Sequence, residues 1–310
     1  MSSNTQRFVI PGAVFGAGVL LIVAALLKLG VGYGPGAALC FLGLVLLGLS
    51  FIPRRVVEDA PPRMPFLEKL ANIFLEPSAV FRNLRAHPSW FAALLIAALL
   101  SFAYTTAFTY RLTPERIVNF TTDKVAERFT SIPPEQIAKM KEQGIDEAKS
   151  PAKVAGHAVT TFLGLFVFMC IVAGLYMLCV LLFGGRLGFW PALSAAAWGA
   201  LPPIIIAKVL SLVLLYIKDP DDIHPILGGE TLVTDNLGVL IKPASSPVLF
   251  AVLSSFGVLA FYQLWLTATG LHNTSDRLSK SSAWTITLIF FGLILLLRIA
   301  SSAIFGNFIS

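Results

Sequence analysis

Lys208 and Arg298 are the two side chains of this 310-residue sequence whose chemistry most needs explaining, because each lies inside a long apolar run. Pro202 and Pro203 come shortly before the lysine, and each proline removes an amide donor that a helix needs. We therefore expect a helix break at Pro202 and Pro203. A break at membrane depth survives only where protein or water satisfies the freed backbone groups, so the pattern predicts a polar place within an apolar helix.

Two interpretations of these cations follow from their cost in a membrane. Each costs on the order of 3 kcal/mol at the bilayer centre, and less when its long stem reaches the interface. In the first interpretation, Lys208 and Arg298 both extend to the outer headgroups. In the second, they converge on one anionic group, either a lipid phosphate or a carboxylate of a nearby loop such as Asp219, Asp221 or Asp222. Both are thus candidate residues for an anionic lipid or ligand.

Another apolar run carries polar side chains that could line a cavity with these cations, namely Tyr262, Gln263 and Thr267. Coupled transport sites usually lie at broken helices near the midplane and use intramembrane carboxylates or repeated topology. No Asp or Glu lies in any of the apolar runs, and no inverted repeat is evident. A transporter or lipid-handling protein, with its site at the broken helix, is therefore the second of our functional hypotheses.

Patterns for catalysis or metal binding are missing from the sequence. No nucleophile stands with an acid–base partner, and no CxxC or i+3/i+4 histidine pair is present. The cysteines all fall in apolar runs, and the histidines are scattered over loops and helix ends: Cys40, Cys170, Cys179, His87, His157, His224 and His272. The sequence predicts a protein that is not an enzyme, with no catalytic residue, metal or cofactor.

Composition places the chain among multi-pass membrane proteins, since 56% of its residues are hydrophobic, 13% are charged and the mean hydropathy is +0.80. A run of about 20 apolar residues crosses a hydrocarbon core as a helix. Seven runs meet that length, which predicts an all-α transmembrane bundle of about seven helices, at 8–27, 33–52, 90–110, 154–183, 191–217, 247–270 and 284–305. In the first run, the GxxxG pattern at 12–16 would let another helix approach closely and offers a route to a homo-oligomer.

The distribution of positive charge predicts a cytoplasmic N-terminus and an extracytoplasmic C-terminus, because positively charged loops stay inside. This topology places ten basic side chains inside: Arg7, Arg54, Arg55, Arg63, Lys69, Arg82, Arg85, Arg186, Arg277 and Lys280. The outer side then has Lys28, Lys218 and Lys242, and a long loop in which acidic residues nearly offset the basic ones.

Three parts follow one another along the chain: a transmembrane hairpin at 1–52, a linker with an amphipathic segment at 53–89, and a five-helix membrane domain at 90–310. In the second part, apolar and basic side chains fall on separate helical faces. We expect either that this segment lies flat on the inner leaflet or that it packs on the protein's own helix ends. The candidate membrane contacts are Phe66, Leu70, Phe74, Phe81, Arg82 and Arg85.

The loop at 111–153 is patterned for structure. Thr113 and Pro114 indicate a helix start, and a second helix is predicted from about Pro134 to Gln143, ending at Gly144. Ser150 and Pro151 repeat the start signal for the next membrane helix. The loop is either a lid over the outer face or a solvated connector.

Three segments, in this order, resemble the signature regions of the Yip1 family of membrane proteins: FLEPSAVFRNLRAHPSW (74–90), FGGRLGFWPALSAAAWGALPP (183–203) and FYQLWLTATGLHNTSDRLSKSSA (261–283). The resemblance implies a five-helix core whose preceding segment is cytoplasmic. It also implies a role like that of the eukaryotic members, which act in membrane traffic and associate with Rab-type GTPases. Leu259, Ala260 and Phe261 stand where members often have an acidic residue, so a polar role there is not expected.

The chain is more similar to the prokaryotic branch, because an extra helical hairpin replaces the long polar N-terminal region. We therefore expect a bacterial inner membrane protein. Its first functional hypothesis is a non-enzymatic, membrane-organising or partner-binding scaffold. The expected partners are the lipid bilayer with its anionic lipids and a membrane or cytoplasmic protein, and no nucleic acid.

Overall fold

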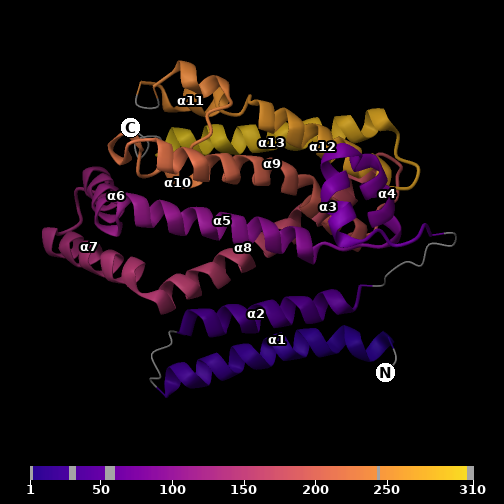
Figure 1. The fold of residues 1–310 in the computed structure, drawn as a ribbon, viewed down its shortest axis with the longest axis horizontal. Helices are drawn as coiled ribbons and strands as arrows, with labels where there is room; N and C mark the ends of the chain where they lie inside the picture. The colour runs from indigo at the N-terminus through magenta and orange to yellow at the C-terminus, as the bar shows by residue number, and fades with distance from the viewer. Residues whose placement is uncertain (1–2, 28–32, 53–59, 243–244, 306–310) are drawn as a thin grey trace. The chain divides into compact units, whose positions relative to one another are not determined.

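The structure, a computed structural model, describes residues 3–27, 33–52, 60–242 and 245–305. All the longer elements within these residues are helices, which confirms the predicted all-α class (Figure 1). The predicted linker at 53–65 and turn at 30–36 lie partly outside them, as do Lys28, Arg54 and Arg55. The chain divides into a first unit, Met1–Val56 with Asp146–Ile171, and a second unit, Val57–Ile145 with Val172–Ser310.

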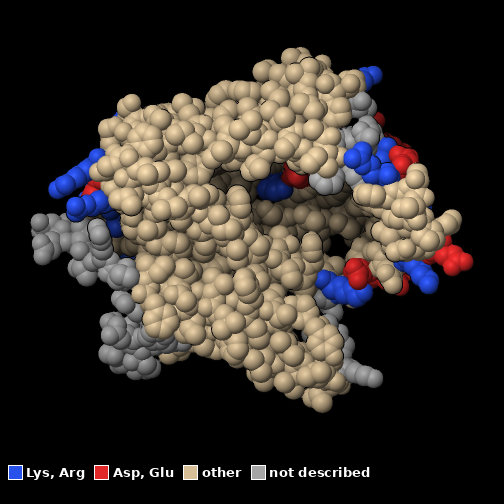
Figure 2. All heavy atoms as spheres, turned by 180° about the vertical axis from the view of Figure 1, so that it is seen from behind, with Lys and Arg blue, Asp and Glu red and all other residues tan. Residues whose placement is uncertain are grey.

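Five helices of the described chain are long and apolar enough to cross a membrane: α2 (Tyr33–Ser50), α5 (Phe91–Leu112), α8 (Pro151–Leu182), α9 (Phe189–Ile217) and α13 (Lys280–Phe305). They correspond to five of the seven predicted spans. The apolar part of α1 (Ser3–Leu26) is shorter and runs from Pro11 to Leu26. Figure 2 shows a face on which charged side chains gather mainly at two edges, with a broad and almost uncharged surface between them.

Glycines bring α1 and α2 of the first unit into backbone contact. A methyl group on Gly18 would stand 2.5 Å from the backbone nitrogen of Cys40, and one on Gly43 would stand 2.6 Å from Cβ of Phe15. Gly12 and Gly16, the predicted GxxxG pair, have open space where a methyl group would project. The hairpin therefore packs through other glycines than the ones in the predicted motif.

In the second unit, α9 packs against both α5 and α12 (Val258–Thr274), and α12 packs against α13. Two short helices, α3 (Phe66–Leu75) and α4 (Pro77–Ala86), lie at one end of these helices, which we call the hairpin end (Figure 1). Pro77 at the first position of α4 makes the sharp turn between them possible, because it needs no amide partner there.

The opposite end, which we call the cap end, carries α6 (Pro114–Arg128) and a run of short elements between α9 and α12. These elements are η1 (Pro220–Asp222), α10 (Leu227–Glu230), η2 (Leu237–Leu240) and α11 (Pro247–Leu253). A buried cluster joins them to the long helices: Tyr104, Phe108, Leu112, Leu215, Ile223 and Leu232. The cap end is thus folded against the bundle.

Two predicted boundaries in this region are confirmed and one is wrong. Helix α6 begins at Pro114 and α8 at Pro151, as expected. The second helix, α7 (Pro134–Lys149), does not end at Gly144 but continues to Lys149. The glycine is needed for packing and not for termination, because a Cβ at Gly144 would stand 2.9 Å from Cγ1 of Val118 in α6.

The sixth predicted span, 247–270, is also wrong. It is interrupted at residues 254–257, between α11 and α12, and α12 then continues to Thr274. With 17 residues, α12 is about 26 Å long, less than the roughly 30 Å of a hydrocarbon core.

Candidate functional site

Helix α9 does not break at Pro202 and Pro203. It continues through both prolines from Phe189 to Ile217, so the predicted helix break is wrong. Both rings are buried, next to Leu201, whose side chain is fully enclosed in the core of the hairpin end. The lost backbone hydrogen bonds are a local effect, and side-chain packing on all sides of the prolines holds the helix together across them.

Lys208 closes one end of a short helix at the cap end. Its Nζ donates a hydrogen bond to the carbonyl oxygen of Glu230 and lies 4.6 Å from the ring centroid of Tyr104. The Tyr104 hydroxyl donates to the carbonyl oxygen of Gly228. The last carbonyls of a helix have no partner within it, so these two side chains of α9 and α5 satisfy the C-terminus of α10.

Arg298 supports the interruption between α11 and α12. Its Nη1 donates to Oγ of Ser255, at a distance of 3.1 Å. On the other side, Oδ2 of Asp235 accepts a hydrogen bond of 2.7 Å from the backbone nitrogen of Leu259 in the first turn of α12. The interrupted helix is therefore the sixth predicted span, and its freed groups are satisfied by residues distant in sequence.

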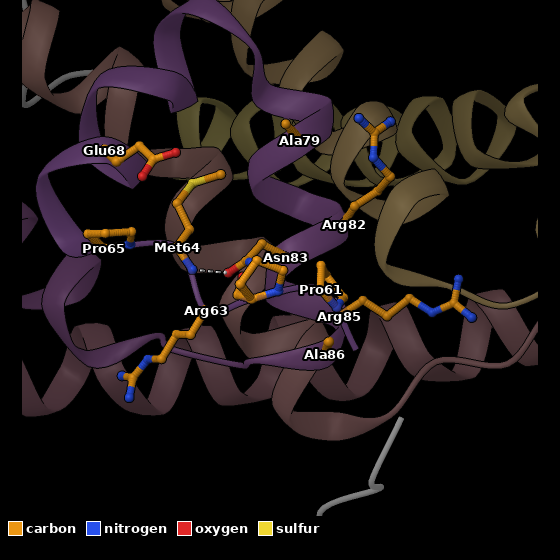
Figure 3. A pocket seen from close by; sticks show the side chains of 11 residues that line it. Pro61, Arg63, Met64, Pro65, Glu68, Ala79, Arg82, Asn83, Arg85 and Ala86 are labelled. Atoms are coloured by element: carbon orange, nitrogen blue, oxygen red, sulfur yellow. Dashed lines mark hydrogen bonds between the residues drawn. The ribbon is translucent and has the colours of Figure 1, made fainter. Parts of the chain in front are cut away.

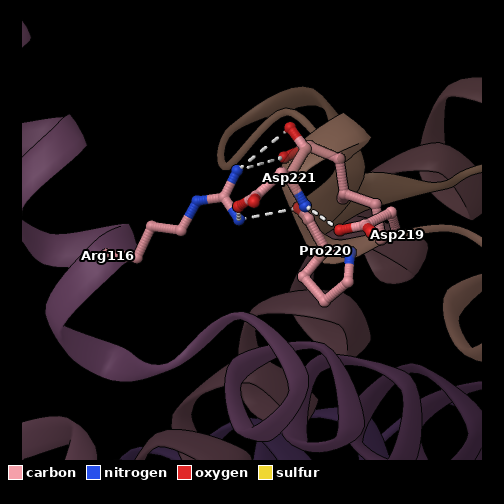
Figure 4. Close-up of polar contacts among 5 residues, drawn as sticks. Arg116, Asp219, Pro220 and Asp221 are labelled. Carbon is pink, nitrogen blue, oxygen red and sulfur yellow. Dashed lines mark hydrogen bonds and ion pairs between the residues drawn. The ribbon is translucent and has the colours of Figure 1, made fainter.

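The predicted convergence of Lys208 and Arg298 on one acidic group is not what the structure has. Among the described contacts, the two cations bind different partners. Asp221 instead accepts from Nη1 of Arg116 at 3.1 Å, and Asp219 caps its own turn by accepting from the Asp221 nitrogen (Figure 4). The guanidinium of Arg116 also donates to the carbonyl oxygens of Pro220, Asp221 and Ile223. Arg116 thus occupies the position that the sequence suggested for Lys208.

The three predicted cavity residues lie on α12. Gln263 donates from Nε2 to Oγ1 of Thr267 at 3.4 Å, one turn along the same helix. Tyr262 stacks on Trp265 and packs against the core of the hairpin end. Among the described residues, no hydrogen bond joins these three to Lys208 or Arg298.

The amphipathic segment packs on the protein's own helices, which is the second of the two arrangements that we expected. Ile73, Val80, Phe81 and Leu84 are all fully buried in one cluster with Trp198, Leu201 and Leu266. Leu70 and Phe74 pack against the same cluster, and the ring of Phe66 lies 6.4 Å from that of Trp198. Phe81, expected at the membrane surface, instead fills a space left by two glycines, Gly199 of α9 and Gly270 of α12.

A buried lysine, which the sequence analysis placed only in the loop charge, fastens α3 to α9. Lys69 is 3% exposed, and its Nζ donates to Oγ of Ser89 at 2.8 Å while lying 5.7 Å from the ring centroid of Trp198. Trp198 in turn donates from Nε1 to the carbonyl oxygen of Ser89 at 2.6 Å. Burial lowers the pKa of Lys69, and the positive charge of Arg63 lowers it further.

The outward side of the hairpin carries a cavity of about 700 Å³, which we call the linker pocket (Figure 3). It lies between the strap Pro61–Pro65 and α4. The buried Asn83 holds the strap, donating from Nδ2 to the carbonyl oxygen of Pro62 at 2.8 Å and accepting at Oδ1 from the Met64 nitrogen. His87 makes a further hydrogen bond, with the carbonyl oxygen of Pro61.

Three arginines and one glutamate contribute the charge of the linker pocket: Arg63, Arg82, Arg85 and Glu68. Their guanidinium groups spread outward around Asn83 (Figure 3). Arg85 forms an ion pair with Asp276, and Arg82 lies 3.8 Å from Glu76 with both side chains exposed. The surface around the pocket is basic, and its apolar lining comes from prolines, Met64 and two alanines.

Comparison with known proteins identifies the family, because the model of the Yip1 domain matches residues 71–301. The chain belongs to the Yip1 family. It is an integral membrane protein, and the resemblance found in the sequence is confirmed. No curated protein and no solved structure matches it. In this Yip1-family protein the matched residues begin within α3 and end within α13, so they include the hairpin end and the cap end.

Proposed function

We propose that this Yip1-family protein is a non-enzymatic, membrane-organising scaffold that binds an acidic segment of a partner protein in its linker pocket. The observation that carries the proposal is the combination of a rigidly held hairpin with a basic pocket on its outward side. Four fully buried side chains fasten α3 and α4 to the bundle, so the pocket is preformed. A preformed site loses little conformational entropy on binding.

The chemistry of the pocket favours an extended acidic peptide. Its prolines, Met64, Ala79 and Ala86 suit an apolar side chain, and the arginines at its edge suit carboxylates on either side of it. Arg63 carries no carboxylate partner among the described ion pairs. We place this end in the cytoplasm of a bacterial cell, with the N-terminus on the same side, because basic residues concentrate there.

A photoreactive amino acid at Ala79, inside the pocket, tests the proposal in cells. We expect a discrete crosslinked partner that disappears in Arg63→Glu/Arg82→Glu and persists in Arg63→Lys/Arg82→Lys, since only the first pair reverses charge. The same amino acid at Lys139 in α7 is the matched control and should give no such product. A product that survives charge reversal would contradict the proposal.

A defined peptide gives the second measurement. The purified protein in lipid discs should bind a fluorescent peptide of alternating glutamate and leucine more tightly than its lysine–leucine counterpart. Binding should weaken with added salt, because surface charges are screened over about 10 Å at 0.1 M ionic strength. Equal affinity for both peptides would exclude recognition by charge.

The alternative of a transporter with its site at a broken fifth helix has less support. Its premise was a break in α9, and that helix is continuous. Lys208 and Arg298 each satisfy groups of the cap end, so neither needs a transported anion to be stable in its position.

A further inference from the structure

The face of α3 that points away from the bundle carries an apolar strip. Leu67 and Leu75 are 75% and 81% exposed, and Ala71, between them, is also exposed. Their spacing of four residues puts them on one side of the helix, roughly opposite Ile73, which is fully buried. In a fully solvated helix such positions would favour polar residues, so the strip needs an explanation.

The depth of α3 follows from its contacts with α9. Phe66 and Lys69 both meet Trp198, nine positions after Phe189 at the start of α9 (189 to 198). At about 1.5 Å per residue Trp198 lies about 13 Å along the helix, and the 29 residues of α9 span about 43 Å.

A hydrocarbon core takes up roughly 30 Å of α9, so about 13 Å of the helix lies outside it. Even if all of that excess projected at the hairpin end, Trp198 would lie at the edge of the hydrocarbon. Any other division of the excess places Trp198 deeper. The apolar strip, on the helix that packs beside this residue, therefore lies at the level where headgroups meet acyl chains.

Charges of the same hairpin lie farther from the bilayer. Arg85 pairs with Asp276, which follows the last residue of α12, Thr274. Arg82 is on the same exposed side of α4. An apolar strip at the acyl boundary with arginines on the headgroup side is the arrangement of helices that bind membrane interfaces.

We infer that Leu67, Ala71 and Leu75 insert into the interface of the bilayer, so that α3 contacts the bundle with one face and lipid with the other. The sequence predicted lipid contact for Leu70, Phe74 and Phe81, which are the residues that the bundle covers. The inference concerns lipid alone and does not depend on the peptide bound in the linker pocket.

Spin labels test the inference in the full chain, with Cys40, Cys170 and Cys179 replaced by alanine. Single cysteines replace Leu67, Ala71 or Leu75, and Glu68→Cys on the same helix is the matched control. The protein is reconstituted in vesicles of phosphatidylcholine and phosphatidylglycerol at roughly 3:1, which carry a negative surface. Collision with oxygen, which concentrates in lipid, is compared with collision with a water-soluble nickel chelate.

We expect the labels at Leu67→Cys, Ala71→Cys and Leu75→Cys to collide several-fold more with oxygen than with nickel, and the label at Glu68→Cys to show the reverse. Nickel-dominated collisions at all three strip positions would overturn the inference, and so would dipolar broadening between copies, which would show that a second chain covers the strip. Since the labelled positions are exposed, an unchanged thermal unfolding midpoint verifies that each variant is folded.

Discussion

The hairpin end and the cap end close the same bundle by different means. At the hairpin end, aromatic and aliphatic side chains fill space, and Phe81 sits against glycines of two helices. At the cap end, long polar side chains donate to backbone carbonyls of irregular segments, as Arg116 and Lys208 do. Packing depends on shape and is insensitive to pH, whereas directional hydrogen bonds allow irregular backbone to be held at a helix end.

The largest effect should come from emptying the hairpin end. Phe81→Ala removes a fully buried ring and leaves a cavity between α4, α9 and α12, so we expect a loss of about 3–5 kcal/mol in unfolding free energy. Unfolding of the purified protein in detergent measures it. Leu75→Ala, on the same hairpin but exposed, is the control and should change the unfolding free energy by less than about 0.5 kcal/mol. Equal losses in both variants would show that the hairpin end is not held by packing.

A smaller and local effect should follow from Arg116→Met at the cap end. The substitution keeps much of the side-chain volume but leaves the carbonyls of Pro220 and Ile223 without this donor, which costs about 1–3 kcal/mol. Hydrogen exchange should accelerate at residues 219–224 and stay unchanged in α3 and α4. Arg116→Lys should recover only part of the protection, because an ammonium group cannot span several acceptors as a guanidinium does.

The pH dependence should be confined to the cap end. Nδ1 of His224 accepts from the backbone nitrogens of Ile226 and Leu227, so this ring must be neutral at that atom. Burial lowers the pKa of His224, and Lys124 lowers it further, while the ring of Phe120 packs edge-on against it. Its stabilising contribution is therefore complete above the unfolded pKa of about 6.5 and is lost as the pH falls toward the lower, folded value.

We expect faster hydrogen exchange at residues 226–230 at about pH 5 than at about pH 7.5, after correction for the intrinsic rate, equivalent to about 1 kcal/mol. His224→Asn keeps an acceptor that does not titrate, so this variant should lose the pH dependence. A pH dependence that is unchanged in His224→Asn would assign it to another group.

The smallest effect compares the two glycines that meet Phe81. A Cβ at Gly270 would stand 3.1 Å from Cε1 of the ring, and one at Gly199 would stand 3.8 Å from Cζ. Gly270→Ala should therefore be less stable than Gly199→Ala by up to about 1 kcal/mol, since only the first forces the ring to move. Thermal unfolding of the two variants measures the difference, and the opposite order would show that the ring is free to shift.

Much of the architecture was predictable, because helix class and span length depend on apolar runs that are local in sequence. Five long helices and the family follow from such signals. The break predicted at Pro202 and Pro203 shows the limit of local reasoning, since burial of both rings outweighs the missing donors. Ser254, Ser255 and Gly257 were a weaker signal, and their interruption depends on Asp235 and Arg298, which no spacing rule connects to them.

The candidate site was predictable only in outline. The amphipathic pattern of 66–85 indicated a segment at the hairpin end but left open whether lipid or protein covers its apolar face. That choice depends on Gly199 and Gly270, whose open surface lies on helices more than 100 residues away in the chain. The linker pocket could not be predicted, because Asn83 gives no sequence signal that it binds the strap.

Trp198 makes the attachment of the hairpin visible to a spectrometer. Its indole is almost fully buried, donates to the backbone of Ser89 and has the Lys69 ammonium beside its ring. Indole emission responds to hydration and to nearby charge, so separation of α3 from α9 would alter the emission of Trp198 while the long helices stay intact. The protein thus contains its own optical reporter of whether the hairpin is docked, without any added label.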